Sequence, residues 1–164
     1  TFIVPEGFIP KEGARIMSLQ EPSQKMSKSD ENPNATILML DSADAITNKI
    51  KRAVTDSIGI VAYNDEQKGI KNLINIYSTF TGESTEAIVS KYEGKGYGDF
   101  KRETAEVIVE GLRPVREKYE YLMENKDYLE EIYAKGAAKA HNKARKTLDK
   151  VYRKVGFVQA KRFE

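Results

Sequence analysis

The pattern of apolar and polar positions changes near residue 40. Residues 1–34 are interrupted by proline or glycine at six positions and contain one short apolar segment, residues 14–19. This segment has the length of one strand, but a lone strand cannot satisfy its own backbone N–H and C=O groups. We therefore expect a single strand here whose hydrogen-bonding partners are not in this chain.

Beyond residue 40, apolar residues recur at intervals of three and four, as on one face of an amphipathic helix. The first helix is predicted to begin at an N-cap, Asp41. A second helix is predicted over residues 67–81, with Gly82 at its end. Ser84 is the predicted N-cap of a third, short helix. The pattern thus predicts a mainly α-helical protein, with a helical bundle from residue 41 onward.

Two long helices are predicted to follow. One begins at Asp99, after the sequence GKGYG (residues 94–98), and contains Pro114, whose missing N–H predicts a kink or break. The other spans residues 127–155 and ends at Gly156. We interpret GKGYG as a turn that needs positive φ angles, because it lacks the G-x-G-x-x-G spacing of a phosphate loop and follows a helix.

The composition narrows the possible chemistry. The chain has 164 residues, of which 32% are charged, and it has no cysteine. This excludes disulfides, thiolate metal sites and cysteine nucleophiles. No apolar run approaches the roughly 20 residues that a membrane-spanning helix requires. We expect a cytoplasmic protein, and we assign no residue to a metal site.

Positive charge is concentrated near the C-terminus. Residues 134–164 contain ten Lys and Arg and two acidic residues, whereas the preceding part carries a net negative charge. This asymmetry indicates either a polyanionic partner or a solvated, lysine-rich helix. In the first case, phosphate contacts would come from the cations of the last helix: Lys143, Arg145, Lys146, Lys150, Arg153 and Lys154.

The segment QKMSKSDENPN, residues 24–34, carries two lysines three positions apart, Lys25 and Lys28, among small hydroxyl residues. Ammonium groups bind phosphate oxygens, and a loop that carries them can close over a ligand and open again. A leaving pyrophosphate would be stabilised in this way, because its negative charge grows in the transition state. The alternative is a Lys- and Ser-rich surface turn, with Pro33 at the first position of a helix.

The segment contains the five residues KMSKS. Its surroundings, EGARIMSLQEPSQKMSKSDENPNATI, resemble the second signature of class I aminoacyl-tRNA synthetases in the form found in the bacterial tryptophanyl enzymes. The stretches AVTDS, YEGKGYGDFK and LRPVREKY, which begin at residues 53, 92 and 112, also resemble this family. The resemblance implies that residues 1–40 are the end of a Rossmann-type nucleotide-binding domain, with its last strand and the KMSKS loop. Residues 41–164 would be the α-helical anticodon-binding domain.

Enzymes of this family activate L-tryptophan with ATP, release pyrophosphate and transfer the tryptophan to tRNA(Trp). The resemblance implies that Lys25 and Lys28 are catalytic residues that hold the ATP phosphates. It places six residues against ATP: Ile16, Lys25, Met26, Ser27, Lys28 and Ser29. ATP with its accompanying Mg²⁺, L-tryptophan and tRNA(Trp) are then the expected ligands, and the full-length enzyme is expected to be a homodimer.

Two further expectations follow from this resemblance. Residues 1–34 are expected to be poorly ordered on their own or paired with another copy. Candidates for contacts with the anticodon bases are Arg113, Arg116, Tyr133 and Tyr152, although for the two tyrosines we favour buried core positions.

The chain also departs from the family pattern. The family's first signature, a HIGH-like motif, is absent, and the only histidine, His141, lies in the basic segment KAHNKA, where we expect a solvated side chain. The chain begins without methionine. We expect a C-terminal fragment of the enzyme that is inactive alone. The alternatives are a freestanding helical tRNA-binding module without catalysis and a helical protein-interaction domain whose KMSKS sequence is accidental.

Overall fold

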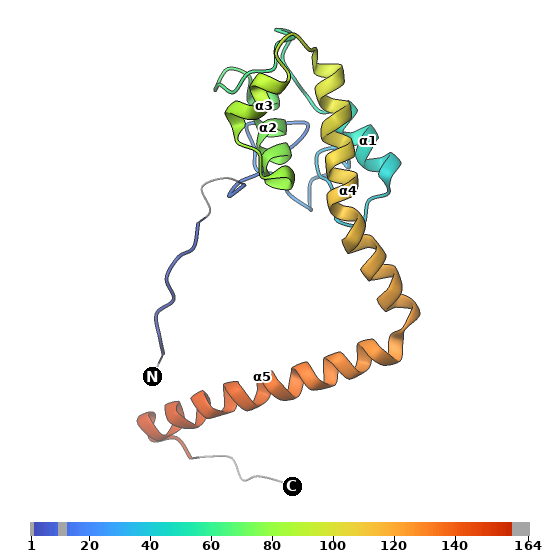
Figure 1. The fold of residues 1–164 in the computed structure, drawn as a ribbon. Helices are drawn as coiled ribbons and strands as arrows, with labels where there is room; N and C mark the ends of the chain where they lie inside the picture. Colours follow the sequence, from blue (N-terminus) through green and yellow to red (C-terminus); the bar gives the residue numbers. More distant parts are fainter. Residues whose placement is uncertain (1, 10–12, 159–164) are drawn as a thin grey trace. The chain divides into compact units, whose positions relative to one another are not determined.

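The computed structural model describes residues 2–9 and 13–158, and these residues form five helices joined by loops (Figure 1). The helices are α1 (Ala43–Lys51), α2 (Lys68–Thr81), α3 (Thr85–Lys91), α4 (Tyr97–Glu124) and α5 (Lys126–Val155). The mainly α-helical fold class predicted from the sequence is confirmed. The chain forms two compact units, one of residues Phe8–Glu117 and one of Thr1–Gly7 with Lys118–Glu164.

Serine side chains cap two of the helices. Ser42 is the N-cap of α1, and Ser84 has the same role for α3, as predicted; each hydroxyl accepts a hydrogen bond from a first-turn N–H. The N-cap predicted at Asp41 is wrong by one residue. The carboxylate of Asp41 instead forms an ion pair with Lys49 of α1 at 2.6 Å.

Glycine residues end two of the longer helices. Gly82 and Gly156 end α2 and α5 in the left-handed conformation, as predicted. Of the kink or break predicted at Pro114, the break does not occur, since α4 continues through this residue. Near the proline, the guanidinium group of Arg116 donates a hydrogen bond to the carbonyl of Val109 at 3.1 Å.

The core of the unit Phe8–Glu117 lies between α1, α2, α3 and α4. Three aromatic rings meet in it, and the rings of Tyr92 and Phe100 pack edge to face with centroids 4.8 Å apart. α2 lies close against the segment that follows α1, because a Cβ atom on Gly69 would lie 2.1 Å from the carbonyl oxygen of Val54. This close approach requires glycine at position 69.

Residues 14–19 do not form the strand that was predicted. Met17 forms an isolated bridge with Lys25, and no named strand occurs in the described residues. The amide side chain of Asn72 in α2 accepts a hydrogen bond from the N–H of Met17 and donates one to its carbonyl, both at 2.8 Å. The partners that we expected outside this chain are therefore supplied within it, by this side chain at Met17 and by the backbone of residues 24 and 26 at Ser18 and Ile16.

The segment after Met17 is packed against the helices. The N–H of Leu19 donates to the carbonyl of Ala35 at 3.0 Å, and the carbonyl of Leu19 accepts from the N–H of Val54 at 2.7 Å. Leu19 and Ala35 are each only 1% exposed. Leu19 thus belongs to the core, which argues against a lack of order at this position within residues 1–34.

α5 buries none of its residues. Tyr133 is 63% exposed, so its predicted core position is wrong. Tyr152 is half-buried, and its ring packs edge to face against Phe157 at 5.9 Å. Among the residues that the structure describes, no helix is both long enough and apolar enough to span a membrane.

Candidate functional site

The KMSKS loop (residues 25–29) begins in a tight pairing of residues 16–18 with residues 24–26. The N–H of Ser18 donates to the carbonyl of Gln24 at 2.8 Å, and the N–H of Met26 donates to the carbonyl of Ile16 at 3.0 Å. A turn joins the two sides, closed by a hydrogen bond from the N–H of Gln24 to the carbonyl of Glu21 at 2.9 Å. These bonds fix the backbone on both sides of Lys25.

Hydroxyl groups hold the second half of the loop. The hydroxyl of Thr36 donates to the carbonyl of Ser27 at 2.6 Å, and the same carbonyl accepts from the N–H of Asp30 at 3.2 Å. The hydroxyl oxygens of Ser27 and Ser29 lie 3.0 Å apart and share a hydrogen bond. The loop backbone is therefore a defined turn that is attached to residue 36.

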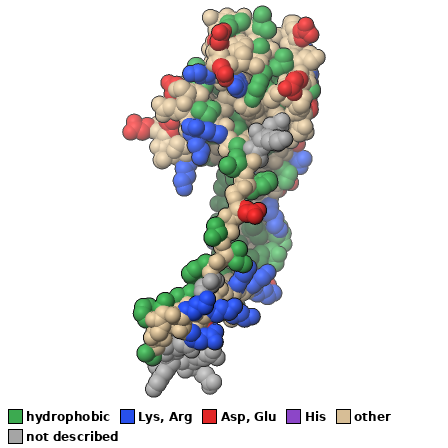
Figure 2. Space-filling model, turned by 90° about the vertical axis from the view of Figure 1, so that its left-hand side faces the viewer, with side chains coloured by type: hydrophobic (Ala, Val, Ile, Leu, Met, Phe, Trp, Pro, Cys, Tyr) green, Lys and Arg blue, Asp and Glu red, His purple; other side chains and the backbone are tan. Residues whose placement is uncertain are grey.

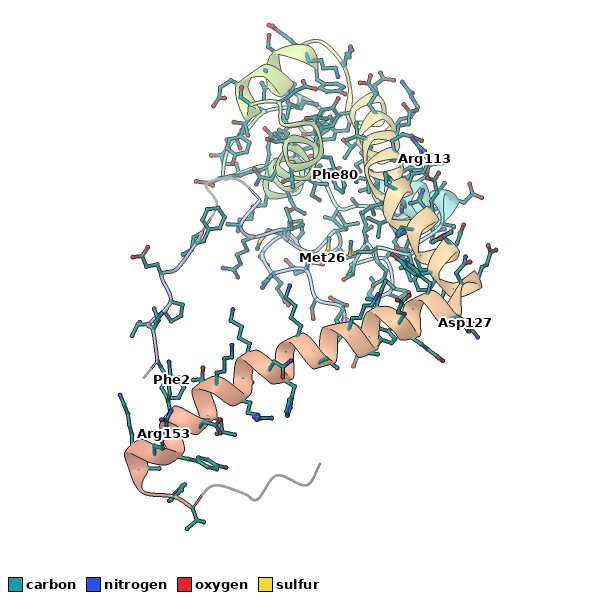
Figure 3. The ribbon with its side chains drawn as sticks, turned by 60° about the horizontal axis from the view of Figure 1, so that its bottom comes forward. Phe2, Met26, Phe80, Arg113, Asp127 and Arg153 are labelled. Carbon is teal, nitrogen blue, oxygen red and sulfur yellow. The ribbon has the colours of Figure 1, made fainter. Side chains whose placement is uncertain are left out.

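The two lysine side chains of the loop are exposed to solvent, whereas its methionine packs against the helices. Lys25 and Lys28 are exposed, and neither ammonium group has an ion-pair partner in the described part of the chain. Met26 is half-buried and lines an apolar groove of about 210 Å³ together with Ile16 and Phe80. Met26 and Phe80 are labelled in Figure 3. The methionine thus anchors the loop, while both lysines stay available to a ligand.

A second cluster joins two of the stretches on which the family resemblance rests. The hydroxyl of Tyr97, at the start of α4, donates to the Asp56 carboxylate at 2.6 Å, and the buried Gln67 amide donates to the same hydroxyl at 2.7 Å. One turn further along α4, the ammonium group of Lys101 donates to the carbonyl of Ala53 at 2.8 Å. α4 is therefore fixed to the segment between α1 and α2.

The surroundings shift the pKa values in this cluster. Burial acts to raise the pKa of the Asp56 carboxyl, but hydrogen bonds from Tyr97, from the N–H of Ile58 and from Gln67 outweigh it, and the pKa lies below its usual value. Burial and the neighbouring Asp56 raise the pKa of the Tyr97 phenol. Burial lowers the pKa of the Lys101 ammonium group. At neutral pH an ionised Asp56 thus faces a neutral Tyr97 hydroxyl.

The remaining candidates lie outside both clusters. Arg113 forms ion pairs with Glu110 at 2.9 Å and Glu117 at 3.1 Å. His141 is exposed on α5, as expected for a solvated side chain. Figure 2 shows several Lys and Arg side chains, in blue, grouped in the lower part of the view. Five of the six predicted phosphate-contacting cations of α5 are exposed, and the sixth, Arg145, is half-buried.

Two residues that position the loop, Asn72 and Thr36, were not among the residues predicted from the sequence. Asn72 is 2% exposed, and its signal was an amide side chain among the apolar residues of α2, where a buried amide needs hydrogen-bonding partners. Thr36 gave no comparable signal, because its bond to Ser27 depends on the turn of the loop between them.

A family model described as tRNA synthetases class I (W and Y) matches residues 1–113. The tryptophan–tRNA ligase of Clostridium perfringens is 57% identical over 158 residues, which cover 96% of this chain and 48% of that protein. The tryptophan–tRNA ligase of Bacillus anthracis is 53% identical over 162 residues, which cover 98% of this chain and 49% of that protein. The chain spans about half the length of the curated relatives that it matches.

Solved structures show the same similarity. The crystal structure of tryptophanyl-tRNA synthetase from Mycoplasma pneumoniae matches with a TM-score of 0.67 and 26% identity, over 91% of this chain and 45% of that one. The enzyme from Campylobacter jejuni, complexed with ADP and tryptophan, matches with a TM-score of 0.65 and 32% identity, over 90% of this chain and 45% of that one.

Proposed function

We propose that this chain, which belongs to the class I tRNA synthetases for tryptophan and tyrosine, is the part of a tryptophan–tRNA ligase that carries the KMSKS loop and a tRNA-contacting helical domain. The whole enzyme would form tryptophanyl-adenylate from L-tryptophan and ATP, release pyrophosphate, and transfer the tryptophan to tRNA(Trp). The observation that carries the proposal is the geometry of the loop. Two exposed ammonium groups stand on a backbone that is held at Met26 and at Ser27.

Lys25 and Lys28 would act as electrostatic catalysts. The leaving pyrophosphate gains negative charge in the transition state, and an ammonium group placed against it lowers the barrier. One ammonium–phosphate contact at ~4 Å is worth about 4 kcal/mol at an effective dielectric constant of 20, and each ~1.4 kcal/mol changes the rate tenfold. On an open surface such a contact is worth only about 0–1 kcal/mol, so the effect depends on a closed site.

The other loop residues would hold the rest of ATP. Ile16 and Met26 form the backbone pair at the base of the loop, against which the adenosine would lie, and Ser27, Lys28 and Ser29 would face the phosphates. Mg²⁺ would arrive bound to the ATP phosphates. In the part of the chain that the structure describes, no three His, Cys, Asp or Glu side chains come together as metal ligands.

The helical part of the chain would contact tRNA(Trp). We propose residues 1–40 as the end of the catalytic domain and residues 41–164 as the anticodon-binding domain, in a cytoplasmic enzyme that acts as a homodimer. The exposed cations of α5 support a contact with RNA phosphates, which positions the RNA without recognising its sequence.

We further propose that the chain alone is inactive. Its only histidine lies on α5, and the HIGH-like signature of the family does not occur in the sequence. The second candidate function is a freestanding helical tRNA-binding module, which the same cations of α5 would support. Both functions predict binding of tRNA, but only the first predicts that the chain completes an active enzyme.

Complementation distinguishes the two. The chain is mixed with the separately produced N-terminal half of the Clostridium perfringens relative, and tryptophan-dependent exchange between ATP and pyrophosphate is followed. We expect no exchange with either part alone and exchange with both. A stable complex of the two parts without exchange, in the presence of salt-dependent tRNA binding by the chain, would support the binding module instead.

A further inference from the structure

Lys49, in the last turn of α1, is a largely buried cation with two partners. The side chains of Lys49 and of its ion-pair partner Asp41 are 12% and 13% exposed, and their charged atoms lie 2.6 Å apart. The ammonium group of Lys49 also donates a hydrogen bond to the carbonyl of Thr36 at 2.9 Å. Apolar residues in place of a buried ion pair often give equal or greater stability, so such a pair is weak evidence for a stabilising role. The contact with Thr36 indicates a different role for Lys49.

The ion pair holds the part of the chain that follows the KMSKS loop. The Asp41 carboxylate also accepts a hydrogen bond from the N–H of Leu38 at 2.8 Å. One residue before Thr36, the carbonyl of the buried Ala35 accepts a hydrogen bond from the N–H of Leu19 at 3.0 Å. The backbone is therefore fixed on both sides of Thr36 and at Thr36 itself, where the donor comes from α1.

The hydroxyl of Thr36 connects this fixed backbone to the loop. It donates a hydrogen bond to the carbonyl of Ser27 at 2.6 Å. The remaining hydrogen bonds of Ser27 and Ser29 are made within residues 27–30. Among the residues that the structure describes, Thr36 is thus the only one outside residues 27–30 that forms a hydrogen bond with residues 27–29.

Lys28 depends on this contact more than Lys25 does. Lys25 lies in the backbone pairing at the base of the loop, where it forms a bridge with Met17. Lys28 directly follows Ser27, so the contact of the Ser27 carbonyl holds the backbone of Lys28 in place. A misplacement of about 1 Å can cost about 10²-fold in the rate of a reaction. The hydroxyl of Thr36 therefore controls the position of Lys28.

We propose that Lys49 is a positioning residue for the release of pyrophosphate. It touches no substrate. It holds Thr36, whose hydroxyl fixes the carbonyl of Ser27 and with it the place of Lys28 against the leaving pyrophosphate. Asp41 keeps the ammonium group of Lys49 in position. This inference rests on the proposed function, in which Lys28 stabilises the leaving pyrophosphate of ATP.

Two sets of substitutions test this role in the enzyme reconstituted with the N-terminal half of the Clostridium perfringens relative. Thr36→Val removes the hydroxyl and keeps the shape of the side chain. Lys49→Met/Asp41→Asn removes both charges, so no buried ion is left unpaired, and the amide oxygen can still accept from Leu38. We expect each set to lower kcat for tryptophan-dependent ATP–pyrophosphate exchange by about 3–10-fold. The KM for ATP should change by less than about twofold, because Lys28 acts in the transition state.

The combination of the two sets shows whether Lys49 acts through Thr36. If it does, the two effects are not additive, and the combined variant has the kcat of Thr36→Val alone. Thr36→Ser keeps a hydroxyl and should restore the rate of the unsubstituted enzyme. The controls are Lys51→Met and Lys68→Ala, since Lys51 is exposed at the end of α1 and Lys68 is exposed at the start of α2. We expect both controls to leave kcat unchanged.

Limited digestion of the chain alone with trypsin, which cleaves after lysine, examines the loop without the reaction. We expect Thr36→Val to speed cleavage after Lys28 by about 3–10-fold, because a loop that opens more often is cleaved faster. The effect after Lys25 should be smaller, since the backbone pairing holds this residue. Cleavage after Lys68 in α2 should keep its rate, because the change is confined to the loop.

The outcomes separate this inference from the function on which it rests. If the unsubstituted pair shows no exchange, the proposed function fails, and the role of Lys49 in the reaction fails with it. If exchange occurs and the variant without the ion pair keeps the kcat of Lys51→Met, the role of Lys49 alone is wrong. If the combined variant loses the product of both factors, Lys49 does not act through Thr36, and the proposal is also wrong. A lower kcat with faster cleavage after both Lys28 and Lys68 indicates general destabilisation, and this result would overturn the proposal as well.

Discussion

Asn72 takes the place of a neighbouring strand at Met17. Because it is buried, its replacement leaves an N–H and a carbonyl of Met17 without partners, and each unsatisfied group costs about 1–3 kcal/mol. We predict that Asn72→Ala lowers the free energy of unfolding by about 2 kcal/mol or more, measured by urea denaturation. Asn75→Ala on the same helix is the control, since Asn75 makes an exposed contact with Tyr63; an equal loss in both variants would refute the role of Asn72.

Tyr97 and Asp56 provide a prediction about pH. The hydrogen bond from Tyr97 lowers the pKa of Asp56, so it stabilises the fold at pH values above the usual pKa of about 3.9, and this stabilisation is lost as pH falls through the lowered pKa. We predict that Tyr97→Phe raises the pKa of Asp56 in an NMR titration and costs about 1.5–3 kcal/mol at neutral pH. This loss in the free energy of unfolding should be smaller at acidic pH, where Asp56 is protonated. Tyr63→Phe, which removes an exposed hydroxyl, should leave the pKa of Asp56 unchanged.

At the scale of residues, the sequence predicted which side chains of the loop carry the chemistry, but it did not predict which residues hold the loop in place. Lys25, Met26 and Lys28 could be named from their order along the chain. Asn72 could not be assigned to Met17, because the two residues are 55 positions apart and no local pattern pairs an asparagine with a distant backbone. The roles of the named loop residues toward ATP stay predictions.

At the scale of elements, helices were the predictable part of the fold. Gly82, Ser84 and Gly156 mark helix ends through local hydrogen bonding and backbone conformation, which depend on neighbours in sequence. The strand predicted at residues 14–19 is wrong because a strand, unlike a helix end, is not determined by neighbours in sequence. Strand pairing depends on distant partners, and here the partner at Met17 is a side chain of α2.

Two helical glycines give opposite predictions. Gly69→Ala places a Cβ atom against the carbonyl oxygen of Val54, and we expect a loss of about 1–3 kcal/mol or more, because backbone must move. Gly98→Ala has open space and a helical backbone, and we expect a gain of up to about 1 kcal/mol. Thermal melting of both variants measures the difference. Equal melting temperatures would contradict the close approach of α2 to Val54.

At the scale of the whole molecule, much of the positive charge lies on α5, a helix that buries none of its residues. Seven of the nine Lys and Arg residues of α5, all but Lys126 and Arg145, are spaced so that they share one side of the helix over about 28 Å. They are Lys135, Lys139, Lys143, Lys146, Lys150, Arg153 and Lys154. We interpret this stripe as a surface for RNA phosphates. Apolar residues recur at helical intervals in this part of the sequence, but periodicity alone does not show whether another element covers such a face.

The stripe predicts a salt effect. Lys146→Ala/Lys150→Ala should weaken binding of tRNA(Trp) and lower the slope of log K against log salt by about 1.4–1.8, since two phosphate contacts are lost. Unrelated tRNA should lose the same amount, because phosphate contacts do not recognise sequence. A loss confined to tRNA(Trp), or a slope equal to that of Lys68→Ala, would contradict the interpretation.

The most direct test of the account concerns Lys28. In the enzyme reconstituted with the N-terminal half of the Clostridium perfringens relative, Lys28→Ala should lower kcat for tryptophan-dependent ATP–pyrophosphate exchange by about 10²–10³-fold, with a much smaller change in the KM for ATP. This split is expected because Lys28 would bind the leaving pyrophosphate more strongly than ground-state ATP. Lys68→Ala should leave both constants unchanged. Exchange by Lys28→Ala at the unsubstituted rate would contradict the assignment of the KMSKS loop to phosphate chemistry.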